Sequence, residues 1–311
     1  MNRRSVLALG GVACLGGLAG CLSSLGLDDE SNDDGTDETD DGPTDGYGLD
    51  EFGRWIPVPD ALDANPVTVT GMAPAALAAT VGETPQGFGP GSQIADQPIE
   101  LPSAADIDYL VGTRFGANET QTVHSGGLVA IRGDLDAETA AADLEAGGFE
   151  HDSSVGGYEC YTDGGFAWGL GSEAFVAASF PEEPMEGLRQ IIAADAGDEP
   201  RVVEERERFR TLQAAQPAGE IVFAEHATGS VTPVLAGTRS DAVVAAGESF
   251  DVHADETTIT TTLVFTSTDA ATESHLEAYV ADSNADPENA TYRLDGDVGE
   301  IEVTRPTDEL L

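Results

Sequence analysis

Residues 257–267, TTITTTLVFTS, say most about the fold of this chain. Read with a period of two, Ile259, Leu263 and Phe265 fall on one face together with Thr261. The opposite face carries Val264 and four threonines, Thr258, Thr260, Thr262 and Thr266. Such alternation of β-branched and aromatic residues is typical of an antiparallel strand that buries one face. The sequence therefore predicts a half-buried strand here, with a hydroxyl-lined outer face.

Similar patterns on either side predict an α+β fold. Strands are expected at 108–115, 127–132, 158–162, 174–180, 220–226, 241–246, 291–294 and 299–304. Asp136 is a suitable N-cap for a short helix ended by Gly147 and Gly148, and Asp269 for a second one. Helices are also expected at 185–196 and 201–215, where apolar residues recur at helical spacing. We expect antiparallel sheets with short helices on one face.

The two halves of the body share an order of predicted elements: strand, strand, capped helix, strand, strand. This order is compatible with two ββαββ-like repeats, and both duplication and unrelated halves stay open. The expected boundaries are a first α+β unit at 53–215, which ends in two trailing helices, and a second unit at 216–311.

The chain opens with MNRRSVLALGGVACLGGLAGC, residues 1–21. Arg3 and Arg4 form a short positive region, and an uncharged run follows from residue 5 to residue 20. That run is too short for a spanning helix, which needs about 20 apolar residues. Residues 1–20 are therefore predicted to be a signal peptide rather than a membrane span or a buried helix.

Two motifs in this opening carry a resemblance. The stretch NRRSVL resembles the twin-arginine export signal, and Leu18-Ala19-Gly20-Cys21 resembles a lipobox, whose cysteine becomes the lipidated first residue of the mature chain. Together they are similar to the exported lipoproteins of haloarchaea. The resemblance implies export of the folded protein and a lipid anchor at Cys21 on the outer face of the cell membrane. It covers residues 1–21 alone and implies no activity.

Charge is the dominant compositional feature. The chain has 13 basic and 58 acidic residues and a net charge of −45, and every basic residue is arginine. Removal of residues 1–20 would leave 11 − 58 = −47. Since the Debye length falls to about 3 Å at 1 M salt, high salt would screen this self-repulsion. We expect a halophilic protein that does not bind nucleic acid, with residues 21–52 as an acidic, disordered tether.

No sequence-local catalytic motif is present, so the chain is predicted not to be an enzyme and to hold no cofactor or metal. Cys160 stands alone between two tyrosines and is interpreted as a strand residue. The pattern Gly169-x-Gly171-x-x-Ala174 precedes a strand-like run rather than a helix, so it predicts a hairpin instead of a dinucleotide site. The five histidines are far apart in the sequence.

Two groups of residues are candidate sites. A cationic cluster is formed by Arg201, Arg206, Arg208 and Arg210. It is either a salt-bridged solvated helix face containing a Glu204–Arg208 pair or a dock for an acidic partner or an anionic headgroup. Asn118 and Asn289 begin the sequons Asn-Glu-Thr and Asn-Ala-Thr and are candidate glycosylation sites.

These observations favour a non-catalytic, lipid-anchored surface protein that serves as a binding or assembly platform for an envelope protein. One alternative is a solute- or ion-binding lipoprotein that serves a transporter. Another is a hydrolase whose residues converge from distant parts of the chain.

Overall fold

The computed structural model describes residues 46–58, 67–82, 99, 102–115, 126–180, 183–227, 241–282 and 289–310. The predicted signal, the lipobox, the lipidation site at Cys21 and the sequon at Asn118 lie outside these residues. Leu49 and Phe52, which fall within the stretch expected to be a tether, are 1% and 0% exposed. The ordered body therefore begins before residue 53.

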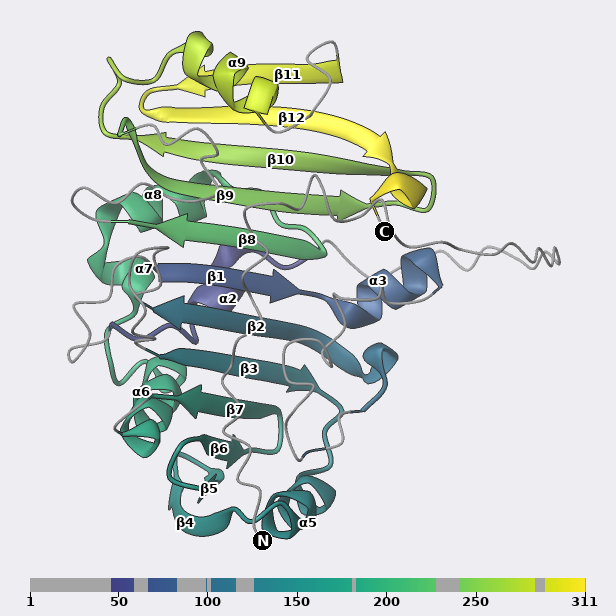
Figure 1. Cartoon of the computed structure of the whole chain (residues 1–311), viewed down its shortest axis with the longest axis vertical. Coiled ribbons are helices and arrows are strands. Elements are labelled where there is room, and N and C mark those ends of the chain that lie inside the picture. The colour runs from purple at the N-terminus through teal and green to yellow at the C-terminus, as the bar shows by residue number, and fades with distance from the viewer. Residues whose placement is uncertain are drawn as a thin grey trace, which may run out of the picture.

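A single sheet of twelve strands organises the described residues (Figure 1). Its order is β11-β12-β10-β9-β8-β1-β2-β3-β7-β6-β5-β4, and all neighbours pair antiparallel. The strands are β1 (Val67–Met72), β2 (Ile107–Phe115), β3 (Gly127–Gly133), β4 (Glu150–Val155), β5 (Tyr158–Thr162), β6 (Ala167–Leu170), β7 (Ala174–Ser179), β8 (Ile221–His226), β9 (Val243–Val252), β10 (Glu256–Phe265), β11 (Ala290–Asp295) and β12 (Val298–Pro306).

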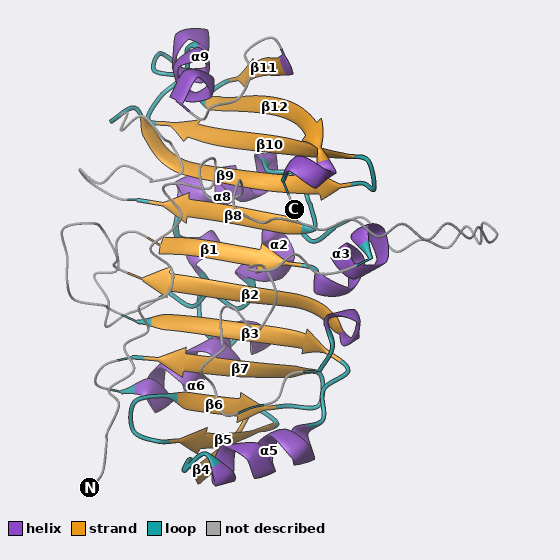
Figure 2. Cartoon of the chain, turned by 45° about the vertical axis from the view of Figure 1, so that its right-hand side comes forward, coloured by secondary structure: helices purple, strands orange, loops and turns teal. Residues whose placement is uncertain are grey.

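Short helices surround the sheet (Figure 2). They are α2 (Leu49–Gly53), α3 (Pro74–Val81), α5 (Ala137–Ala146), α6 (Pro184–Ala196), α7 (Val202–Glu205), α8 (Glu207–Ala215) and α9 (Glu273–Asp282), with 3-10 turns η2 (Ala104–Asp106) and η5 (Thr307–Glu309). The predicted combination of antiparallel sheet and short helices is confirmed. No helix in the described part of the chain is long and apolar enough to span a membrane.

Helices pack on both faces of the sheet, so the expectation that they lie on one face is wrong. On the first face, apolar side chains of α2, α6, α7 and α8 form one core with residues such as Val69 and Leu128. On the second face, α9 packs near one end, over Leu263, and α5 near the other end, over Ile131. Two-sided burial explains why several strands are apolar on both faces.

The predicted strand at 257–267 is β10, which lies between β9 and β12. Leu263 and Phe265 point into the second-face core, as their alternation indicates. Thr258 and Thr260 on the opposite face are half-buried, whereas Thr262 is 0% exposed. The hydroxyl-lined face is thus only partly open, because α8 packs against this end of β10.

The two predicted units share one sheet rather than forming two. Strand β8, just after the expected boundary at 215/216, pairs with β1 through six residue pairs and with β9 on its other side. Hydrogen bonding therefore continues across the boundary. The two ββαββ-like repeats are not separate bodies in this fold.

Local signals at helix ends had mixed outcomes. Asp136 caps α5 as predicted, since its carboxylate accepts from the backbone N–H groups of Glu138 and Thr139 at 3.0 and 3.1 Å. Asp269 does not cap α9, which begins at Glu273 instead. The helix expected at 201–215 is two helices, because Arg206 has extended backbone angles between α7 and α8.

Substitution of Gly71 tests the packing of α2 on the sheet. A Cβ at Gly71 would overlap the ring of Phe52. We expect Gly71→Ala to lower the free energy of unfolding by about 1–3 kcal/mol, the usual range for an overpacked core. Chemical denaturation in molar salt measures this. Gly165→Ala is the control, since its added Cβ would be 3.6 Å from Asp163 Oδ1, and an equal effect of the two substitutions would contradict the packing.

Candidate functional site

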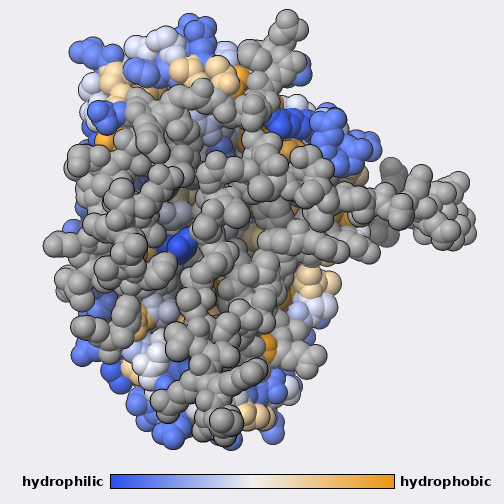
Figure 3. Space-filling model, in the orientation of Figure 1, coloured by the Kyte–Doolittle hydropathy of each residue, from blue (hydrophilic) through white to orange (hydrophobic). Residues whose placement is uncertain are grey.

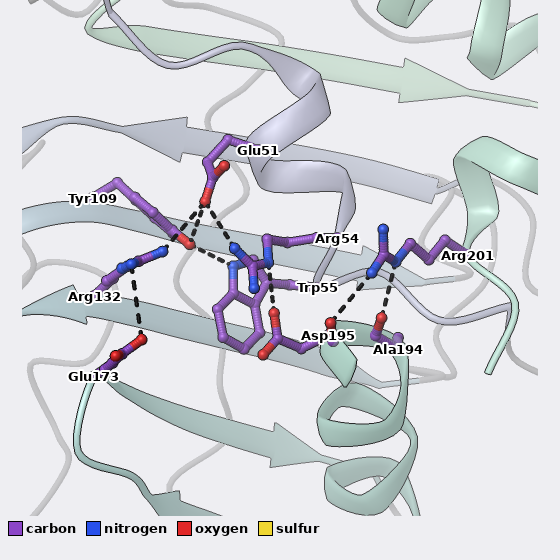
Figure 4. A network of polar contacts seen from close by, with 9 residues as sticks. All are labelled: Glu51, Arg54, Trp55, Tyr109, Arg132, Glu173, Ala194, Asp195 and Arg201. Atoms are coloured by element: carbon purple, nitrogen blue, oxygen red, sulfur yellow. Dashed lines mark hydrogen bonds and ion pairs between the residues drawn. The ribbon is translucent and has the colours of Figure 1, made fainter. Parts of the chain in front are cut away.

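A network of polar contacts surrounds α2 on the first face of the sheet. We call it the α2 junction, and Figure 4 shows its members. They are Glu51 of α2, Arg54 and Trp55 just after α2, Tyr109 of β2, Arg132 of β3, Glu173 before β7, Asp195 of α6, and Arg201, the residue before α7. Segments from five parts of the sequence therefore meet at one place.

A buried hydrogen bond lies at the centre of the junction. The indole Nε1–H of Trp55 donates to the Tyr109 hydroxyl at 2.8 Å, and that hydroxyl donates to Glu51 Oε1 at 3.1 Å. Trp55 and Tyr109 are 2% and 1% exposed. Because a buried indole N–H without an acceptor is costly, this bond fixes how the segment after α2 lies on β2.

Ion pairs form the outer part of the junction. Arg54 Nε donates to Asp195 Oδ1 at 2.6 Å, its Nη1 lies 3.3 Å from Glu51, and its guanidinium lies 5.4 Å from the centre of the Trp55 ring. Arg132 lies 3.7 Å from Glu51 and 3.9 Å from Glu173. These side chains are about one-third exposed except Asp195 at 18% and Glu173 at 81%, so molar salt reaches most of the pairs.

The chain on both sides of α2 is also attached to the body. Tyr47 forms an antiparallel bridge with Gly219, and Pro57 forms one with Arg201. Phe52 packs against Gly71 of β1. The segment 46–58 is therefore fixed by backbone bonds at both ends and by a buried hydrogen bond in the middle.

The titration of the junction favours a structural role over proton transfer. Burial raises the pKa of Tyr109 to about 12, and burial also raises the pKa of the nearby Tyr158 to about 12. Both hydroxyls stay protonated at neutral pH, so neither is a base. The arrangement can hold segments together and present charge, but among these residues we find no activated nucleophile.

The four arginines predicted as a partner contact are each engaged within the fold. Arg201 donates to the carbonyls of Ala194 and Asp195 near the end of α6, at 2.9 and 3.2 Å. Arg210 donates to the carbonyls of Val203 and Glu204 in α7.

The remaining two arginines differ in their surroundings. Arg208 forms an ion pair with Asp297 in the β11–β12 turn and donates to the Thr266 carbonyl at 3.1 Å. The expected Glu204–Arg208 pair is therefore replaced, because the break at Arg206 separates the two helices. Arg206 is half-buried, and burial lowers its pKa. A partner that docks here would compete with these internal acceptors.

Other predicted residues lie apart from the junction. Cys160 is a buried residue of β5, as interpreted from the sequence, and burial raises the pKa of its thiol. The glycine pattern at 169–174 is the turn of the β6–β7 hairpin, as predicted. Asn289 is exposed immediately before β11. Among the described residues, no three His, Cys, Asp or Glu side chains are grouped so as to hold a metal ion.

His226 and Glu248 are among the titratable groups that are buried or half-buried outside the junction. His226 on β8 packs edge-on against Phe209, and burial, together with the charge of Arg206, lowers its pKa to about 4. Glu248 on β9 accepts hydrogen bonds from Tyr279 of α9 and, at 3.5 Å, from Thr261 of β10. Burial raises the pKa of Glu248, and no cation faces it from these elements.

The described part of the surface is mostly hydrophilic at the edges of the view in Figure 3. Among the described residues, Leu294 is the one large apolar side chain that is well exposed, at 41%. This agrees with a chain whose charged residues are chiefly acidic.

The buried bond of the junction predicts a salt-independent loss of stability. Tyr109→Phe leaves the Trp55 N–H without its acceptor, so we expect a loss of about 1–3 kcal/mol that is similar at low and molar salt. Asp195→Asn should cost less, and its effect should shrink as salt rises. Denaturation curves at several salt concentrations measure both. Tyr161→Phe is the control, and a loss as large as that of Tyr109→Phe would contradict this account.

Glu248 predicts a pH dependence of stability. Its folded pKa is raised above the unfolded value of about 4.3, so stability falls as pH rises from that value through the folded pKa. We expect Glu248→Gln to remove this loss and to raise Tm at pH 7 by roughly 2–4 °C, which corresponds to about 1 kcal/mol. Glu302→Gln, on the exposed face of β12, controls for net charge. Equal Tm changes in the two variants would contradict the prediction.

Comparisons with known proteins gave similarity to solved structures alone. Crystal form I of TP0453 has a TM-score of 0.47 and 12% identity, over 83% of this chain and 94% of that chain. Crystal form III has 0.49 and 11%, over 83% and 95%, and crystal form IV has 0.46 and 9%, over 85% and 95%. Similarity at this level carries no conclusion about function. No protein-family model matches the sequence, and no curated protein is significantly similar to it.

Proposed function

We propose that this chain is a lipid-anchored surface protein of a halophile, exported in folded form, whose sheet is a non-catalytic platform for an envelope partner. One observation supports the proposal: α2, the first helix in the described part of the chain, packs on the middle of the sheet. Phe52 packs on β1 and Trp55 bonds to β2, the sixth and seventh strands of the twelve. A tether attached there would leave the strands on both sides, from β8 to β11 and from β3 to β4, free to bind a partner.

The alternatives receive less support from the same residues. A solute-binding protein with two hinged lobes needs a flexible joint between them, whereas hydrogen bonds run unbroken from β4 to β11 here. A thiol hydrolase needs an accessible, activated cysteine, whereas Cys160 is buried with a raised pKa. The described histidines lie in different elements and have separate partners. His151 of β4 contacts Glu159, His226 of β8 contacts Phe209, and His275 of α9 bonds to Thr272.

We also propose that the body arose by duplication. In sheet order, β1, β2 and β3 are followed by β7, β6, β5 and β4. In the chain, α5 connects β3 to the edge strand β4, and β5, β6 and β7 then lead back toward β3. In the same way β8-β9-β10 is followed by β12 and β11, and α9 connects β10 to the edge. The two series meet antiparallel at β1 and β8, and the first contains one more hairpin. The helix of each series packs on the same face.

Anchoring is tested by substitution of the lipobox cysteine. Cys21→Ser cannot accept a lipid, so we expect this variant in the medium while the unchanged chain stays with the membrane fraction. Fractionation and immunoblotting in molar salt measure the distribution. Cys160→Ser is the matched control and should remain on the membrane, whereas retention of Cys21→Ser on the membrane would contradict the anchor.

The platform is tested by cross-linking of the tagged full chain in native membranes, kept in molar salt. We expect a stoichiometric protein partner, which should survive substitution at an exposed acidic side chain outside the α2 junction, such as Glu302→Gln. Thermal stabilisation of the purified body by a small solute, without a protein partner, would instead favour the solute-binding alternative.

A further inference from the structure

The sheet ends in two edges that differ in how they are protected. At one end, β4 carries the carboxylates of Glu150 and Asp152, and its pairing with β5 contains a register shift. Charges and bulges are the usual means by which a free edge avoids pairing with another chain. This edge is therefore protected by its own sequence.

The opposite edge, β11, also carries two charged residues, Arg293 and Asp295, but its pairing contains no bulge. Its six residue pairs with β12 run without a register shift. The charge of Arg293 is paired with Glu300 at 3.3 Å on β12, and Leu294 is 41% exposed. Within the described residues, β12 is the one strand beside it. A regular edge with an exposed leucine is a template for edge-to-edge association, and molar salt would screen the acidic repulsion that otherwise opposes it.

A sequon lies at the start of this edge. Asn289-Ala290-Thr291 runs into β11, and the side chains of both Asn289 and Thr291 are exposed in the folded chain. Accessibility in the folded state matters here, because the proposed export route carries the protein already folded. An enzyme acting outside the cell would reach Asn289 without unfolding β11.

We propose that Asn289 carries an N-linked glycan that shields the β11 edge. In this transfer the Asn289 amide nitrogen bonds to the anomeric carbon of a lipid-phosphate-linked saccharide. The bond from that carbon to the phosphate oxygen breaks, and the amide proton leaves with the released lipid phosphate. A bulky, hydrated group at the residue just before the edge strand would then hinder a second strand from pairing along it. The proposal rests on the export that the proposed function includes.

The modification is tested by mass spectrometry of the full chain, recovered from the surface of the halophilic host that makes it. Cleavage after arginine places Asn289 in the peptide 240–293 and Asn118 in the peptide 115–132, so the two sequons are read separately. We expect a saccharide mass on 240–293 that is lost in Asn289→Gln and in Thr291→Val and is kept in Thr291→Ser. An unmodified 240–293 peptide from surface-exposed protein would overturn the glycan while leaving export intact. Failure of the chain to reach the surface would overturn both.

Shielding is tested by the oligomeric state in molar salt. We expect the unchanged protein to be monomeric by size-exclusion chromatography with light scattering, and Asn289→Gln to form dimers or larger species. Adding Leu294→Lys to Asn289→Gln should restore the monomer, because a lysine on the edge discourages strand pairing. A monomeric Asn289→Gln variant would overturn the shielding role.

Discussion

The contact between Phe52 and Gly71 is the constraint on which much of the first face depends. A glycine at this position of β1 leaves room for an aromatic ring to lie directly on the backbone of a central strand. Once that ring is in place, Trp55 reaches the Tyr109 hydroxyl, and Arg54 reaches Asp195 on α6. Gly53 packs against Val203 of α7 in the same way, since a Cβ added at Gly53 would lie 2.9 Å from Val203 Cγ1. Small residues on both partners thus let α2 sit close enough for its polar neighbours to bond.

Arginine has a particular use in a chain so rich in carboxylates. Each described arginine takes part in an interaction within the fold, as an ion pair, as a donor to carbonyl groups or in another contact. Its planar group makes several hydrogen bonds that do not depend on long-range charge, so these contacts persist where salt screens Coulomb attraction. Arg201 and Arg210 show this best, because both bond to neutral carbonyls at the ends of helices.

The sequence predicted strands with one buried face, such as β10, and also β7 and β8, which are buried at nearly every position. It missed β1, β4 and β6. Alternation located β10 and β12, and the carboxylate of Asp136 located the start of α5. Strand β6, AWGL, is buried at every position, so it has no period of two, and β4, EHDSSV, is mostly exposed and polar. The helix break at Arg206 could not be predicted from the sequence, because the seven-residue spacing between Val202 and Phe209 fits a continuous helix equally well.

The candidate site escaped prediction for a related reason. Its central bond joins Trp55 to Tyr109, which are 54 residues apart, and Glu51 lies in a stretch whose acidic composition predicts disorder. The signal that could have located it is the apolar set Leu49, Phe52, Trp55 and Ile56, which begins inside that acidic stretch. The average composition of the stretch hides these four apolar residues, whereas their spacing along the chain would have revealed them.

Attachment at the centre of the sheet has a geometric consequence for an anchored protein. Twelve strands at about 4.8 Å spacing span about 53 Å, so each edge lies within about 30 Å of α2. The residues between Cys21 and Gly46 could reach at most about 80 Å when fully extended. Under the proposed anchoring, a tether fixed at one edge would place the two edges at very different distances from the attachment point. A tether fixed at the centre would instead give β4 and β11 equal access to a partner beside the membrane. Equal access is useful only if neither edge pairs with an edge strand of another copy of this chain. The central attachment is therefore connected to the protection of the edge strands.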